Sequence, residues 1–98
     1  CEGGVESFST TEAKKYLAHV KGWQLDGKMI RKQFKFKNFV EAMTFVNKVA
    51  VVAEREGHHP DIKFGWGYVE INLTTHALKG LSMNDFIMAS KINTLRKK

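Results

Sequence analysis

The stretch FVEAMTFVNKVAVVAEREGHHP, residues 39–60, decides how this chain is organised. Its first part carries apolar side chains at helical spacing, and its end holds two adjacent histidines and the only proline of the protein. Asn38 precedes it as a favourable N-cap, and Gly57 is typical of a helix end. Pro60 then biases the residue before it toward extended backbone. The stretch therefore predicts a long helix that ends at a pair of histidines.

The apolar residues of this helix predict a broad buried face. They recur at i, i+3, i+4 and i+7 spacing: Phe39, Ala42, Met43, Val46, Val49, Ala50 and Ala53. Phe45 and Val52 widen the stripe beyond what one sheet needs to cover. We therefore expect these two side chains to form a second buried surface, such as a contact between subunits.

Strand-like alternation of apolar and polar residues flanks the helix on both sides. Before it, Asp26-Gly27 favours a tight hairpin between a short strand and a return strand at 29–36. After it, residues 62–73 predict a second hairpin that turns at Gly65-Trp66-Gly67. Lys32 interrupts the apolar face of the return strand, so we expect it at a sheet edge or beside a partner.

Capping signals predict a helix near each end of the chain. Ser9 and Glu12 have the spacing of a capping box, and helical periodicity follows to about residue 20. Ser82 and Asp85 repeat that spacing before the last helix. The last helix has one apolar stripe at Met88, Ile92 and Leu95, and another, on the opposite side, at Met83, Phe86 and Ile87. Such a two-sided helix also suggests a contact between subunits.

The order of these elements is α-ββ-α-ββ-α. Hairpins joined by helices predict an α+β fold with two layers, in which helices pack on one face of a four-stranded antiparallel sheet. A chain of 98 residues supports one hydrophobic core. We therefore expect a flexible N-terminal segment at residues 1–8 and a single domain at residues 9–98.

Composition narrows the classes of protein and of partner. Hydrophobic residues make up 43% and charged residues 27%, as in soluble globular proteins. No apolar run reaches the roughly 20 residues that span a membrane, so no membrane partner is expected. Cys1 is the only cysteine, which excludes an internal disulfide and favours a reducing, cytoplasmic setting. The net charge of +6 suits an anionic partner, but no nucleic-acid-binding motif accompanies it, and we expect no nucleic acid partner.

The histidines are the candidate functional groups, because imidazole exchanges protons near neutral pH. His58 and His59 leave the helix end together, and His76 follows the second hairpin. Since a hairpin returns the chain to where it began, His76 can approach the pair. Trp66 lies at the turn of that hairpin, away from His76 unless another subunit or a curled turn intervenes.

Four interpretations of these histidines remain open from the residues alone. In the first, they are surface or capping groups. In the second, they bind a metal together with Asp61 or Asp85, although their spacing is not that of a metal site. A Ser-His-Asp site would need a nucleophile elbow, and the sequence has none. General acid–base chemistry on a small molecule needs only imidazoles, a carboxylate and an aromatic surface, all of which are present.

A spaced array of residues adds a family resemblance. The pattern Glu54-x₃-His58-His59-Pro60-x₅-Trp66-x₉-His76-x₈-Asp85 resembles the signature of the pterin-4a-carbinolamine dehydratases, with every position filled. Residues 34–39, 72–76 and 80–82 look similar to the family as well. The resemblance implies the same fold, a homodimer or homotetramer, and no metal or organic cofactor.

The resemblance also implies an activity. It is the dehydration of 4a-hydroxytetrahydrobiopterin to quinonoid dihydropterin, which recycles tetrahydropterin for the aromatic amino-acid hydroxylases. His58 and His76 would be the catalytic acid–base groups. His59, also counted as catalytic, would mainly bind and orient the pterin, and Pro60 would fix the pair.

Three further signature positions are expected to bind substrate, each with a structural alternative. Trp66 would stack on the pterin or pack under the site, Asp85 would touch the pterin or cap the last helix, and Glu54 would orient a histidine or solvate the helix end. A second function is also implied, because some animal members serve as dimerisation cofactors of a homeodomain transcription factor. That role would use the apolar helix surface around Phe45 and Val52.

Overall fold

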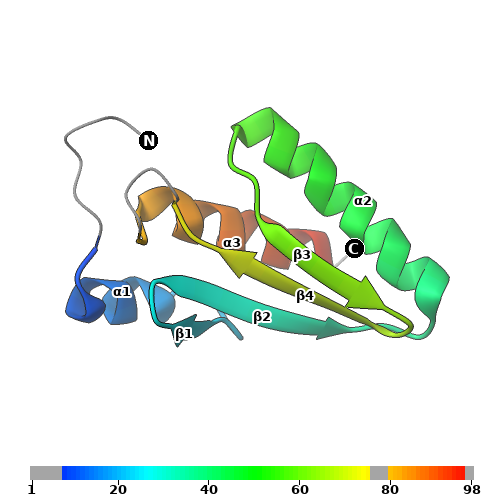
Figure 1. The fold of residues 1–98 in the computed structure, drawn as a ribbon, viewed down its shortest axis with the longest axis horizontal. Coiled ribbons are helices and arrows are strands. Elements are labelled where there is room, and N and C mark those ends of the chain that lie inside the picture. The colour runs from blue at the N-terminus through cyan, green and yellow to red at the C-terminus, as the bar shows by residue number, and fades with distance from the viewer. Residues whose placement is uncertain (1–7, 76–79, 97–98) are drawn as a thin grey trace.

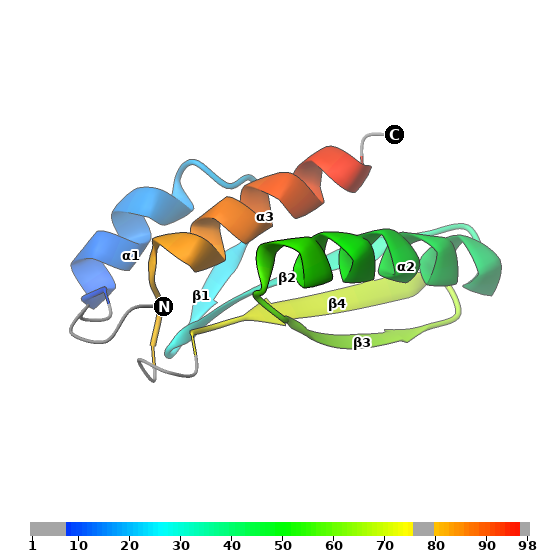
Figure 2. The same cartoon turned by 90° about the horizontal axis from the view of Figure 1, so that it is seen from above.

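The computed structural model describes residues 8–75 and 80–96 of the chain. The elements are α1 (Thr10–Leu17), β1 (Gln24–Asp26), β2 (Met29–Lys35), α2 (Phe39–Glu56), β3 (Asp61–Gly65), β4 (Tyr68–Leu73) and α3 (Met83–Arg96). The predicted order, α-ββ-α-ββ-α, is confirmed. The three helices lie on one face of the sheet, which gives the two predicted layers (Figures 1 and 2).

The sheet has four antiparallel strands in the order β1-β2-β4-β3. Both hairpins turn through two residues, since Asp26 pairs with Met29 and Gly65 pairs with Tyr68. β4 pairs along most of β2, whereas β1 pairs with β2 only as far as Arg31. Among the described residues, the rest of β2 therefore has no strand beside it on that side.

The ends of α2 follow the local signals in the sequence. The Asn38 side chain accepts a hydrogen bond from the Glu41 amide at 2.9 Å, which makes it the predicted N-cap. Gly57 ends the helix in the left-handed region, with φ of +66°. The capping box of Ser9 and Glu12 is also present, but α1 ends at Leu17, earlier than the periodicity predicted.

The face of α2 that packs on the sheet differs from the predicted stripe. The buried residues of α2 are Ala42, Phe45, Val49, Val52 and Ala53. Phe39 and Met43, predicted to be core, are 44% and 41% exposed. Phe45 lies 4.8 Å from Phe34, ring centre to ring centre. The prediction that Phe45 and Val52 form a second surface is therefore wrong: the helix is rotated so that they fill the core and leave Phe39 and Met43 on its flank.

A similar correction applies to α3. Phe86 was grouped with Met83 and Ile87 on a side opposite the core, yet it is buried at 4% exposure. Its ring packs beside those of Phe8 and Tyr16, with centres 5.9 and 5.8 Å away. Phe8 also donates its amide to the Leu81 carbonyl, so this residue of the expected flexible segment is anchored, while residues 1–7 lie outside the described residues.

Lys32 lies on the helix-facing side of β2, just past Arg31, where β1 stops pairing and β2 becomes the edge of the described sheet. Its ammonium donates to the Lys21 carbonyl at 2.9 Å and to Asn93 Oδ1, on α3, at 2.8 Å. It also lies 4.7 Å from the centre of the Phe34 ring. The partner expected for this lysine is therefore a helix of its own chain.

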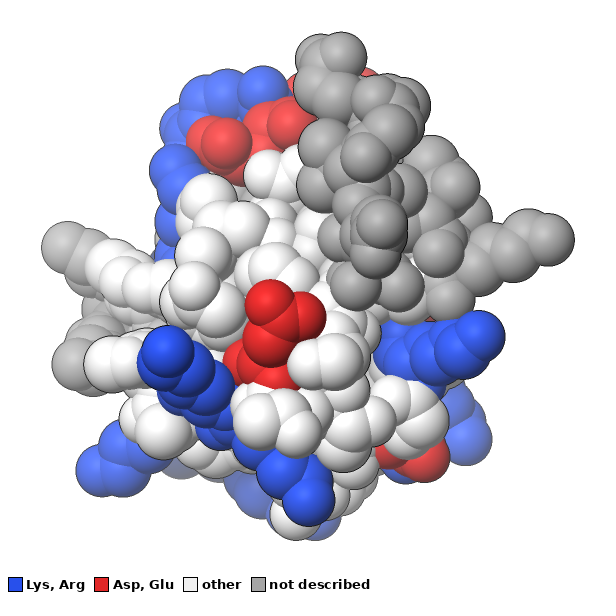
Figure 3. Space-filling model, turned by 90° about the vertical axis from the view of Figure 1, so that its left-hand side faces the viewer, with Lys and Arg blue, Asp and Glu red and all other residues white. Residues whose placement is uncertain are grey.

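Charged side chains are unevenly spread at the surface. On the side of α1, the middle of the surface is uncharged apart from an acidic group, and Lys and Arg side chains lie around its margin (Figure 3). Among the described helices, none is both long and apolar enough to span a membrane.

The conformation of Gly57 gives a prediction on stability. A Cβ at this position meets nothing within 4 Å, so only the backbone opposes a side chain there. Gly57→Ala should lower the free energy of unfolding by about 1–2 kcal/mol, the cost of left-handed backbone for an L-residue. Gly57→Asn should lose less, because Asn tolerates this conformation better. Urea denaturation measures both, and an alanine variant as stable as the parent would contradict the assignment.

Candidate active site

The end of α2 presents its two histidines differently. His58 donates its amide to the Ala53 carbonyl, and its side chain is 15% exposed. The side chain of His59, the next residue, is 62% exposed. Half-buried Pro60 follows, and β3 begins directly after it. The local geometry therefore turns one imidazole inward and leaves the other at the surface.

The inward imidazole meets a buried carboxylate. Asp85, in the first turn of α3, has no exposed surface, and its Oδ1 lies 2.6 Å from Nε2 of His58. A carboxylate can only accept hydrogen bonds, so Nε2 carries the proton of this bond. In the neutral imidazole the other nitrogen, Nδ1, then keeps a lone pair that can take up a proton.

The second oxygen of Asp85 is held by two further donors. Thr75 donates its hydroxyl to Oδ2 at 2.8 Å, and the Ser82 amide donates to the same oxygen at 3.0 Å. Oγ of Ser82 lies 2.7 Å from Oγ1 of Thr75. Because the single hydroxyl proton of Thr75 goes to Asp85, the Ser82 hydroxyl donates to Thr75. A continuous chain of hydrogen bonds therefore runs from Ser82 through Thr75 and Asp85 to His58 at the end of α2.

Polar groups buried in this way must be paired to be tolerated. Within the described part of the chain, every buried side-chain nitrogen and oxygen has a hydrogen-bond partner. The Ser82 amide bond is the contact expected of a helix cap, as one interpretation of Asp85 predicted. The same carboxylate pairs with His58 and has no exposed surface of its own.

His59 pairs with Glu54 at the surface. Nε2 of His59 lies 2.5 Å from Oε2 of Glu54, and the Glu54 side chain is 79% exposed. Glu54 thus contacts a histidine, as one of its two predicted roles required. Since both groups face solvent, this pair is held far less rigidly than the buried one.

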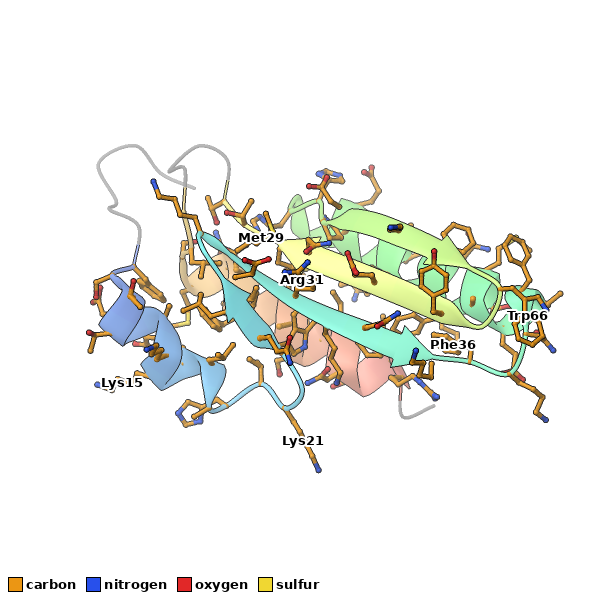
Figure 4. The ribbon with its side chains drawn as sticks, turned by 60° about the horizontal axis from the view of Figure 1, so that its bottom comes forward. Lys15, Lys21, Met29, Arg31, Phe36 and Trp66 are labelled. Atoms are coloured by element: carbon orange, nitrogen blue, oxygen red, sulfur yellow. The ribbon has the colours of Figure 1, made fainter. Side chains whose placement is uncertain are left out.

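Of the other predicted site residues, Trp66 lies far from this place, and His76 cannot be compared because it is not among the described residues. Trp66 is 72% exposed at the β3–β4 turn, at the end of the sheet away from the start of β3 (Figure 4). The seven residues from His59 to Trp66, at roughly 3.3 Å each, put it about 20 Å along the strand. His76 lies outside the described residues. Its preceding neighbour, Thr75, pairs with Gly80 in an isolated antiparallel bridge.

Thr75 is the functional candidate that sequence reasoning missed. A signal for it was present in the alternation of the strand. Every second side chain points to the same face, so Thr75 shares the face of Val69, Ile71 and Leu73, which are fully buried. A hydroxyl on the buried side of a strand needs a buried partner. That partner is Asp85, ten residues further along the chain.

No metal cluster is formed by the residues that can be placed. In residues 8–75 and 80–96, no three His, Cys, Asp or Glu side chains are grouped so that they could hold a metal ion. The metal alternative required His76, which is outside this set. The groups near His58 suit proton transfer, because a buried carboxylate fixes one ring nitrogen and leaves the other to exchange a proton.

Comparison with solved structures agrees with this fold. A protein described as a transcriptional coactivator/pterin dehydratase from Brucella melitensis has a TM-score of 0.86 and 34% identity, covering 92% of this chain and 98% of that one. A pterin dehydratase-like protein described as a RuBisCO assembly factor in the alpha-carboxysome has a TM-score of 0.66 and 30% identity, covering 79% and 92%.

Comparison of sequences gives the family. A protein of Halorhodospira halophila named "Putative pterin-4-alpha-carbinolamine dehydratase" is 47% identical over 97 residues, covering 97% of this chain and 89% of that protein. A protein of the same name from Nitrosospira multiformis is 48% identical over 95 residues, covering 97% and 84%. The family model for pterin 4 alpha carbinolamine dehydratase matches residues 6–95. The resemblance is thereby confirmed, and this chain belongs to the pterin-4a-carbinolamine dehydratase family.

Proposed function

We propose that this protein is a hydro-lyase that converts 4a-hydroxytetrahydrobiopterin to quinonoid dihydropterin. The observation that carries the proposal is the His58–Asp85 bond, buried and supported by Thr75, in a chain of this family. The products would serve the regeneration of tetrahydropterin for aromatic amino-acid hydroxylases, in the cytoplasm.

The reaction breaks the bond between C4a and its hydroxyl group. The departing oxygen needs a proton to leave as water, and a ring nitrogen must lose one to form the new double bond. His58 would exchange one of these protons at Nδ1, while Asp85 stabilises the imidazolium that forms when His58 takes up a proton. His76 would exchange the other proton, an assignment that rests on the family signature.

The remaining signature residues would have different roles in binding the pterin. His59, oriented by Glu54 and set by Pro60, faces solvent and so can meet a ligand directly. Asp85 would act through His58 rather than by contact, because its carboxylate has no exposed surface. Trp66 would reach a histidine site only from a second copy of the chain, given its place at the far turn.

The pair of His58 and Asp85 gives the first test of this mechanism. His58→Ala should lower kcat by about 10²–10⁴-fold, the usual contribution of a positioned acid–base group. Asp85→Asn should also lower kcat by at least tenfold. A carboxamide can donate as well as accept, so it no longer holds the proton on Nε2 of His58. Asp26→Asn, at a surface residue paired with Arg31, is the matched control. Spectrophotometric assay of carbinolamine dehydration measures all three, and unchanged rates for His58→Ala would refute its role.

Thr75 gives a second test, because it touches Asp85 and not the solvent. Thr75→Val keeps the shape and removes the donor to a charged group, worth about 1.5–3 kcal/mol. We expect kcat to fall by about ten- to hundredfold with KM little changed, and Thr75→Ser to restore most of the rate.

Thr44→Val is the control for Thr75, since its hydroxyl donates to a backbone carbonyl on the exposed side of α2. Circular dichroism shows whether each variant is folded. A folded Thr75→Val protein with the parent's kcat would mean that Thr75 serves stability alone.

We also propose that the chain forms a homo-oligomer through α2. Its exposed apolar side chains are Phe39, Val40, Met43 and Val51. Val40 and Val51 are each 63% exposed, and Phe39 stacks on Phe64 with ring centres 5.6 Å apart. Apolar surface gathered on one helix is typical of an interface. The alternative is a protein-binding module, and the titles of the two structural relatives name such roles for those proteins.

Lysines placed in this surface test the proposal. The double variant Val40→Lys/Met43→Lys should be monomeric by light scattering at concentrations where the parent is not, because buried charges oppose association. Gln33→Lys, on the exposed face of the sheet, is the control and should leave the mass unchanged. A parent that is itself a monomer at micromolar concentration would refute the homo-oligomer and leave the face to another protein.

A further inference from the structure

A basic hollow lies at the other end of α3 from Asp85. It has a volume of about 320 Å³ and is bounded by the loop after α1, the inner side of β2 and the last two turns of α3. Four of its lining residues carry basic side chains: His19, Lys21, Lys32 and Arg96. Asn93, also in the lining, lies eight positions after Asp85 in α3, which is about 12 Å along the helix. The hollow is therefore separate from the histidine site.

The hollow has no acidic residue in its lining. The ion pairs among the described residues use other basic groups: Arg31, Arg55, His58, His59 and Lys91. Among the described residues, no carboxylate oxygen lies within 4 Å of a side-chain nitrogen of Lys21, Lys32 or Arg96. Cations around one hollow repel one another unless an anion joins them.

Lys32 is held in place at the base of the hollow by neutral groups. Two of its three N–H bonds point to the Lys21 carbonyl and to Asn93 Oδ1. Asn93 is itself fixed, because it accepts from Trp23 and donates to the Lys21 carbonyl. An ammonium group has three donors, so one remains beyond these two bonds, and the Phe34 ring lies 4.7 Å from the Nζ atom.

Burial and the positive potential of the hollow both act on the pKa of this lysine. Partial burial lowers the pKa of Lys32, and the nearby charges of Lys21 and Arg96 lower it further. Each cause disfavours the charged ammonium. An anion in the hollow would oppose both effects, whereas the neutral carbonyl partners do so only in part.

Arg96 and Lys21 complete the arrangement from the rim. The Arg96 guanidinium lies over the Phe36 ring, 4.7 Å from its centre, and donates to the Lys35 carbonyl through Nη2. This leaves other N–H groups of its planar fork, a geometry that suits phosphate oxygens. Lys21 belongs to the lining of the hollow and extends from the loop before β1, with its side chain directed away from the ribbon (Figure 4).

We propose that this hollow binds the phosphate group of a small phosphorylated molecule, with Lys32, Lys21 and Arg96 as its ligands. Three cations, of which Lys32 is anchored by hydrogen bonds, suit the charge and hydrogen-bonding capacity of one phosphate group. The volume is in the range of small-molecule sites. The site does not depend on the dehydratase proposal, since His58 and His59 pair with Asp85 and Glu54, which are not in its lining.

A titration with inorganic phosphate at constant ionic strength tests the site, and two-dimensional NMR of the backbone amide groups monitors it. We expect saturable shifts at residues 19–21, 32 and 90–96, with chloride giving none. Lys21→Gln/Arg96→Gln should weaken binding at least tenfold. The control variant Lys28→Gln/Lys63→Gln removes the same charge elsewhere and should bind as the parent does. Both double variants should keep the parent's dehydratase activity.

Three results would overturn the site. One is the absence of saturable shifts in the parent. Another is equal weakening in both double variants, which would mean attraction by net charge alone. The last is a change in molecular mass for Lys21→Gln/Arg96→Gln, measured by light scattering, which would show that a carboxylate of a second copy is the anion.

Discussion

The buried carboxylate of Asp85 is the constraint on which the rest of the structure depends. An ionised carboxylate in a core is tolerated only when its lone pairs are used. Asp85 obtains donors from His58, Thr75 and the Ser82 amide, which come from the end of α2, the segment after β4 and the start of α3. Three parts of the chain must therefore meet at one point, and that meeting fixes how α3 is seated against the sheet.

The sheet topology makes this meeting possible. β3 starts after Pro60, which follows the histidines, and β4 runs back beside it, with Asp61 paired to Asn72. The chain after β4 thus returns to the level of His58, where Thr75 joins the network. A hairpin with a longer strand on one side would carry Thr75 past Asp85. The two-residue turn at Trp66-Gly67 is consequently part of what assembles the site, although it lies at the other end of the sheet.

Most of the fold could be predicted because its signals are local. The caps at Ser9 and Asn38, the left-handed Gly57 and both hairpin turns need only neighbouring residues. The rotation of α2 could not, because apolar residues occupy both candidate faces, and only contact with the sheet selects Phe45 over Met43.

The site divides in the same way. His58 and Asp85 were both named from the sequence, but their bond joins residues far apart in the chain. Periodicity says nothing about such a pair. Thr75 and the network of Lys32 with Asn93 are equally non-local, and each appears in the sequence only as a polar residue at an apolar position.

The two ends of α3 have opposite electrostatic tasks. The positive end of the helix dipole lies at the first turn, where it stabilises Asp85 and so lowers the cost of burying that carboxylate. The negative end lies at the last turn, where Arg96 and its neighbours gather. The dipole offsets part of the repulsion among these cations, typically by less than about 1 kcal/mol at an exposed helix end. That is less than the full charge of an anion would supply, so the helix alone does not complete the basic hollow. One helix thus holds a paired charge at its start and an unpaired cluster at its end, and substitutions at one end should leave the other intact.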